Sequence, residues 1–105
     1  MGEPTTLRVV SAETKSVSGS SVQSSAIGTA GATPGADVVV RVVADTACWL
    51  KTGSNPTAVA GAADNFYLPA GAVEYLDITA GEKIAAIQAS AGGNLNIAVL
   101  AKRVL

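Results

Sequence analysis

Few side chains in this sequence could take part in catalysis. The chain has no histidine and one cysteine, Cys48, which leaves zinc, haem and Cys-His nucleophile sites without a ligand set. Two carboxylate pairs, Glu74 with Asp77 and Asp37 with Asp45, are candidates for acid–base or glycosidic chemistry. Strand alternation puts Glu74 and Asp77 on opposite faces of their strand. Asp37 and Asp45 lie at the two ends of another strand. We predict that the protein is not an enzyme and has no catalytic residue.

Sites for metals, cofactors or phosphate are also not expected. The acidic residues are too dispersed for a calcium loop, and Gly28 to Gly31 does not continue into the Gly-Lys-Ser/Thr ending of a phosphate cradle. The serines lack a G-x-S-x-G elbow and a histidine base. Cys48 lies in an apolar run beside Trp49, so we interpret it as a small buried hydrophobe. We therefore expect no cofactor and no metal.

Aromatic residues leave two interpretations open. Trp49, the only tryptophan, is expected to be an anchor in the core, fully or half buried. The alternative is a stacking platform for a carbohydrate or receptor, in which Tyr67 and Tyr75 would join it. Sugar-binding surfaces usually need several exposed aromatic rings, which favours the core.

Composition limits the possible partners and the compartment. The 105 residues suit one domain, and seven basic and eight acidic residues, a net charge of −1, are scattered singly. No charged stripe attracts nucleic acid or an anionic membrane. The first ten residues do not have the pattern of a signal peptide, and no apolar run approaches the ~20 residues of a membrane span. We expect synthesis in the cytoplasm, without nucleic-acid or membrane partners.

The stretch from Asp64 to Ile87 predicts a meander of antiparallel strands. Three short apolar runs are separated by turns at Pro69-Ala70-Gly71 and Ala80-Gly81. Asp37 to Ala44 is the strongest strand, and Ala47 to Lys51 and Asn94 to Leu100 are further strands. The chain has about seven or eight short strands and no helical period. This predicts an all-β fold, a small antiparallel β-sandwich connected as a jelly roll or Greek key. The expected core is Val38, Val40, Val42, Trp49, Leu68, Leu76, Ile78, Ile84, Ile87, Leu95 and Ile97.

The first 36 residues are expected to differ from the sandwich core of residues 37–105, within a single domain overall. They comprise a polar leader, a short strand at Leu7 to Val10, and an extended, Ser- and Gly-rich N-terminal arm. The serine-rich stretch from Thr14 to Ala26 is either a flexible linker or an edge strand or arm that orders on a neighbouring subunit. The period of two from Lys15 to Gly19 favours the second interpretation.

Three stretches resemble a family of small virion structural proteins of tailed bacteriophages. They are VVVRVVADTACWLKTGSNPTA from Val38, YLPAGAVEYLDI from Tyr67 and AGEKIAAIQASAGGNLNI from Ala80. The similarity covers about sixty residues, and its motifs describe turns and core positions rather than a site. The N-terminal third lies outside it.

The resemblance implies a non-enzymatic structural role in the virion. The protein is expected to be a capsid decoration or cement protein on the capsid surface, made in the host bacterium, which stabilises the shell by bridging capsid subunits. Its partners would be the major capsid protein or other virion proteins, and copies of itself, most often in a trimer. Alternatives are a neck or tail component and a carbohydrate- or receptor-binding module. The expected assembly contacts are Lys15, Val17, Val22, Asn55, Pro56 and Val59.

Overall fold

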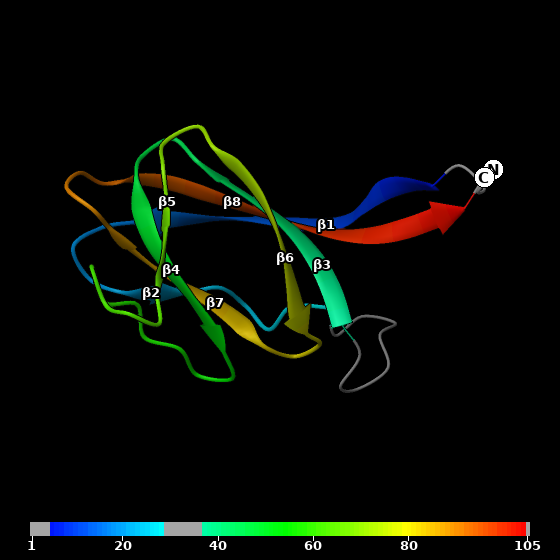
Figure 1. The fold of residues 1–105 in the computed structure, drawn as a ribbon, viewed down its shortest axis with the longest axis horizontal. Coiled ribbons are helices and arrows are strands. Elements are labelled where there is room, and N and C mark those ends of the chain that lie inside the picture. Colours follow the sequence, from blue (N-terminus) through cyan, green and yellow to red (C-terminus); the bar gives the residue numbers. More distant parts are fainter. Residues whose placement is uncertain (1–4, 29–36, 105) are drawn as a thin grey trace.

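The chain folds into two antiparallel four-stranded sheets packed face to face. The computed structural model describes residues 5–28 and 37–104, in which every regular element is a strand (Figure 1). This confirms the all-β, two-sheet prediction. The elements are β1 (Thr5–Val17), β2 (Val22–Gln23), β3 (Asp37–Ala44), β4 (Cys48–Gly53), β5 (Phe66–Leu68), β6 (Val73–Thr79), β7 (Lys83–Gln88) and β8 (Gly93–Val104).

Successive strands of the chain mostly alternate between the two sheets. Sheet A has the order β1-β8-β3-β6, and sheet B has the order β2-β7-β4-β5. Only β4 and β5 follow one another within a sheet; each other strand is followed by one in the opposite sheet. The central strands of both sheets are therefore paired on both edges, while β1, β6, β2 and β5 form the sheet edges.

The turns at Pro69–Ala72 and Thr79–Glu82 have the same hydrogen bond and the same backbone conformation. Ala72 N donates to Pro69 O at 3.1 Å, and Glu82 N donates to Thr79 O at 2.9 Å. The third residue of each turn is a glycine with positive φ, 77° at Gly71 and 97° at Gly81. A type II turn requires positive φ at this position, where glycine has no steric penalty. Both turns carry the chain from one sheet to the other, so β5, β6 and β7 do not pair with one another and the predicted meander is wrong.

The core fills the space between the sheets. Val40, Val42, Leu50, Leu68 and Leu95 are fully buried, as expected for alternate residues on facing strands. Three residues expected in the core, Trp49, Leu76 and Ile87, are only partly buried. Leu76 packs against the core from the edge strand β6. Trp49 and Ile87 are cross-strand partners one residue from the inward-facing Cys48 and Leu50, so alternation directs them to the outer face of sheet B.

The N-terminal third is part of both sheets. β1 pairs with β8 along its whole length, with a register shift between Val9 and Ser11. The expected short strand at residues 7–10 is thus a 13-residue strand that includes the start of the predicted arm. Val17 is 2% exposed and lies in the core. β1 is an edge strand of sheet A, so for Thr14 to Val17 the favoured edge-strand interpretation holds and the flexible-linker interpretation does not. Such a strand tolerates serine and threonine on its solvent side. The Gly- and Pro-rich loop at residues 29–36 lies outside the described residues.

Two turns at one end of the sandwich are joined by side chains. Asp45 Oδ1 accepts a hydrogen bond from Asn94 N at 2.7 Å, and Thr46 Oγ1 donates to Ala91 O at 2.7 Å. A Cβ atom at Gly93 would collide with Asp45 Oδ1 and would lie 2.7 Å from Thr46 Cγ2. Glycine is needed at residue 93 because the β3–β4 turn lies directly against it.

Candidate interaction surfaces

A loop covers part of the outer face of sheet B. The β4–β5 connection, residues 54–65, contains three of the expected assembly contacts, Asn55, Pro56 and Val59. Gln23 Nε2 donates to Pro56 O at 2.7 Å and to Asn55 Oδ1 at 2.9 Å. Ala58 N donates to Ser21 Oγ at 2.8 Å. The loop is thus bound to the β2 segment of its own chain, so it is not a free tip.

The end of this loop is held by an ion pair and an amide. Lys51 Nζ and Asp64 Oδ2 are 2.7 Å apart, and Asn65 bridges Asp64 Oδ1 and Val59 N through its side chain. The hydrogen bond from Lys51, followed by that from Asn65, lowers the pKa of Asp64. Both charged side chains reach solvent, so the pair contributes little to stability.

The six expected assembly contacts fall into different environments. Val17 and Pro56 are buried, and Lys15 and Val22 are partly buried, which leaves them little surface for a partner. Asn55 is exposed and accepts the hydrogen bond from Gln23. Val59 is 53% exposed, and of the six it presents the most apolar surface to solvent. Val22 and the loop residues lie close together, because the β2 segment and the loop are hydrogen-bonded, whereas Lys15 and Val17 lie on β1 of the other sheet.

The aromatic side chains do not converge on one platform. The Trp49 and Tyr67 rings are tilted by 58° with centroids 5.2 Å apart, on neighbouring strands of sheet B. Tyr75 lies on β6 of sheet A and is paired with Arg41. Arg41 alternates with Val40 and Val42, which are buried between the sheets. Arg41 and its cross-strand partner Tyr75 therefore lie on the face of sheet A that points away from sheet B. A ring-binding site made from all three residues would have to span opposite faces of the molecule.

The candidate carboxylates of each pair lie apart, and the thiol is buried: Asp37 begins β3 and Asp45 follows its last residue. On β6, Glu74 pairs with Val42 and Asp77 with Val39, so the two carboxylates face opposite sides. Asp45 caps a turn. Cys48 is fully buried, and burial raises the pKa of its thiol to about 11, so the reactive thiolate is scarce at neutral pH. Across residues 5–28 and 37–104, no cluster of His, Cys, Asp or Glu suits a metal ion.

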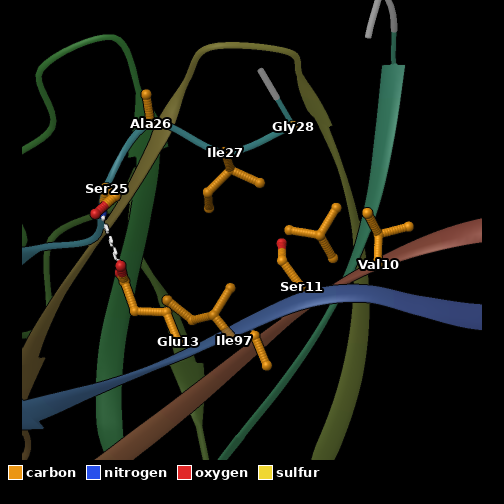
Figure 2. A pocket seen from close by; sticks show the side chains of 10 residues that line it. Val10, Ser11, Glu13, Ser25, Ala26, Ile27, Gly28 and Ile97 are labelled. Carbon is orange, nitrogen blue, oxygen red and sulfur yellow. Dashed lines mark hydrogen bonds between the residues drawn. The ribbon is translucent and has the colours of Figure 1, made fainter. Parts of the chain in front are cut away.

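A small cavity opens where the two sheets separate at the β1 edge. Its volume is about 230 Å³, and it lies between β1 and the segment from Ser25 to Gly28, with Ile97 and Val99 of β8 at its base. Figure 2 shows Ile27 pointing into it from one side and Glu13 from the other. The Glu13 carboxylate already accepts a hydrogen bond from Ser25 N at 3.0 Å. Its lining is otherwise apolar or hydroxyl-bearing, so it provides no acid–base pair.

Most of the exposed large apolar side chains lie on sheet A; the other two, Val59 and Tyr67, lie in the β4–β5 loop and on β5. Val9, Val10, Val73 and Tyr75 are each about half exposed, and all lie on β1 or β6. Their positions on edge strands could not be identified without the strand order. The described residues contain no helix long and apolar enough to cross a membrane.

Comparison with known proteins gives no relative. No protein-family model matches the chain, and neither a curated protein nor a solved structure matches it.

Proposed function

We propose that the chain is a non-enzymatic virion structural protein of a tailed bacteriophage, a decoration or cement protein that stabilises the capsid by bridging its subunits. The sequence resemblance of residues 38–99 is the starting point. The strand order supports a jelly-roll topology, since β1-β8-β3-β6 facing β2-β7-β4-β5 is what two interlocked Greek keys of eight strands produce. Jelly rolls are common in viral capsid proteins, but the same fold serves other functions, so the role depends on a surface.

The observation that carries the proposal is a ribbon formed by the two ends of the described chain. β3 pairs with β8 only as far as Leu100, whereas β1 continues to pair with β8 from Ala101 to Val104. Residues 5–8 and 101–104 therefore form a two-stranded ribbon that extends from the sandwich (Figure 1). It contributes to a long dimension of 44 Å, against 27 and 23 Å for the other two.

This ribbon has two edges on which strands can be added. Among residues 5–28 and 37–104, neither of its strands has a second neighbour in sheet A beyond Leu100. An isolated pair of strands is marginally stable in water. Unpaired backbone groups on an edge are templates for a strand from another chain. Binding to a neighbouring capsid subunit would satisfy these groups and stabilise the ribbon. Many weak contacts of this kind, repeated around a shell, add up to a strong attachment.

The first experiment measures the number of copies of this chain per major capsid protein in purified virions by quantitative peptide mass spectrometry. Decoration predicts about one copy per capsid subunit or a simple fraction of that. A few copies per particle would indicate a neck, tail or receptor-binding component instead. Absence of the chain from virions would refute the structural role.

A second experiment tests the ribbon. Capsids lacking the chain are incubated with the full chain or with a variant that lacks residues 1–8 and 101–105, and bound protein is measured after sedimentation. The variant should fold, because β3 pairs with β8 inside residues 95–100, yet bind much less. A circular dichroism melt provides the folding control. Equal binding by both proteins would show that the ribbon is not the attachment surface.

A further inference from the structure

The outer face of sheet A has a mixed apolar and charged pattern at its β3–β6 end. Cross-strand register pairs Val39 with Asp77 and Arg41 with Tyr75. These residues alternate with the buried Val38, Val40 and Val42, so all four side chains start from the outer face. Tyr75 is 55% exposed. The next pair along, Val43 with Val73, continues the apolar surface.

Arg41 has an unmet hydrogen-bonding requirement at the centre of this face. Its Nε atom is buried and has no hydrogen-bond partner. Within the part of the chain that the structure describes, Lys51 and Asp64 form the only ion pair, so Arg41 has no carboxylate within 4 Å there. A buried donor without an acceptor is unfavourable, and the surrounding Val39 and Val43 supply none from their side chains. A second surface that covers this face and brings a carboxylate would pair with the guanidinium charge of Arg41, which has no ion-pair partner among the described residues.

We infer that this face binds the same face of a second copy of the chain around a two-fold axis. In a two-fold interface, if residue i contacts residue j of the other copy, j also contacts i. Arg41 and Asp77 occupy opposite corners of a four-residue block, and Val39 and Tyr75 occupy the other two corners. A two-fold axis along the Val39–Tyr75 diagonal brings Arg41 close to Asp77 of the second copy, and Asp77 close to the second copy's Arg41. The valines and the tyrosines then meet their own counterparts.

The geometry of such a pairing matches known sheet packing. Strands are spaced about 4.8 Å apart and alternate residues about 6.8 Å along a strand, so the diagonal is inclined roughly 35° to the strands. A two-fold axis along it makes the strands of the two copies cross at roughly 70°, near the orthogonal class of sheet packing. Tyrosine and arginine at the centre are the residue types that contribute most to protein interfaces. The pairing does not depend on the virion role, because it needs only this chain.

Charge reversal tests the inference in purified protein by sedimentation equilibrium over a range of concentrations. The unaltered chain should form dimers. Arg41→Asp or Asp77→Arg alone places like charges opposite each other, which should weaken dimerisation roughly a hundredfold or more. The double variant carrying both changes restores opposite charges and should recover most of the affinity. Failure of the double variant to recover it, when folded, would refute the Arg41–Asp77 contact.

Two further variants separate this contact from general effects. Glu74→Arg makes the same charge change on the same strand as Asp77→Arg but on the opposite face, so it should leave dimerisation unchanged. Tyr75→Glu changes an exposed residue, keeps the fold and should prevent dimerisation even if Arg41 variants fail to fold. A chain that is monomeric at all concentrations, or one that forms the trimer implied by the resemblance, would overturn the two-fold pairing. Neither outcome bears on copy number in virions.

Discussion

Replacing Ser24 by alanine tests how firmly the serine-rich segment is built into the sandwich. Ser24 is 5% exposed and immediately follows β2. Its backbone N donates to Ile84 O at 2.8 Å, and its Oγ accepts from Ile84 N at 2.9 Å and donates to Ser25 O at 2.9 Å. Ile84 is 1% exposed. Ser24→Ala removes the only acceptor that the structure shows for the Ile84 amide without changing the backbone.

The expected loss follows from the buried amide. Leaving a buried donor without an acceptor costs about 1–3 kcal/mol, more than the net value of an average hydrogen bond. A domain of this size has a total stability of roughly 5–15 kcal/mol. Each kcal/mol lost lowers the melting temperature by roughly 4–8 °C. Ser24→Ala should therefore produce a clearly measurable destabilisation while the protein remains folded.

The assay is urea denaturation followed by Trp49 fluorescence, with the free energy of unfolding extrapolated to zero denaturant. Ser25→Ala is the matched control, because Ser25 is exposed and its side chain makes no hydrogen bond in the structure, although its backbone amide bonds Glu13. The control should lie within about 0.5 kcal/mol of the unaltered chain. If Ser24→Ala is as stable as Ser25→Ala, the segment is held loosely and the argument for its integration fails.

Four other outcomes are expected. Deleting residues 1–26 should abolish the cooperative thermal melt, because it removes an edge strand from each sheet; a retained melt would show that these strands are dispensable. Cys48 should resist iodoacetamide at pH 8 in native protein and react after denaturation, since burial raises its pKa to about 11; rapid native labelling would contradict its burial. Gly93→Ala should destabilise the fold through its collision with the adjoining turn, while Gly19→Ala, which meets only ordinary contacts, should be neutral in the same melts. Asp64→Asn should lower the free energy of unfolding slightly at pH 7. Because folding lowers the pKa of Asp64 from its ordinary value, the difference in stability between the two proteins should shrink as the pH falls through that lowered pKa. A difference that persists in acid would exclude the ion pair as its cause.

The candidate surfaces could be predicted only in part, because sequence periodicity gives the face of a residue but not its neighbours. Alternation alone places Arg41 on the face of its strand opposite to Val40 and Val42. That Asp77 and Tyr75 lie beside it depends on the pairing of β3 with β6, which joins segments more than thirty residues apart. The ribbon depends likewise on β1 reaching the far end of β8.

Local features of the sequence determined the strand class, the valine strand and the two glycine turns, because alternation and positive φ are properties of a few adjacent residues. They also excluded histidine-dependent chemistry outright. Tertiary structure decided that the N-terminal third is built into both sheets. Val17 and Ser24 are buried because β8 and β7 lie beside them. It also turned the β4–β5 loop back onto its own chain and directed Trp49 outward. Contacts between distant segments produce these outcomes, and a local pattern of small polar residues carries no information about which distant strand will cover it.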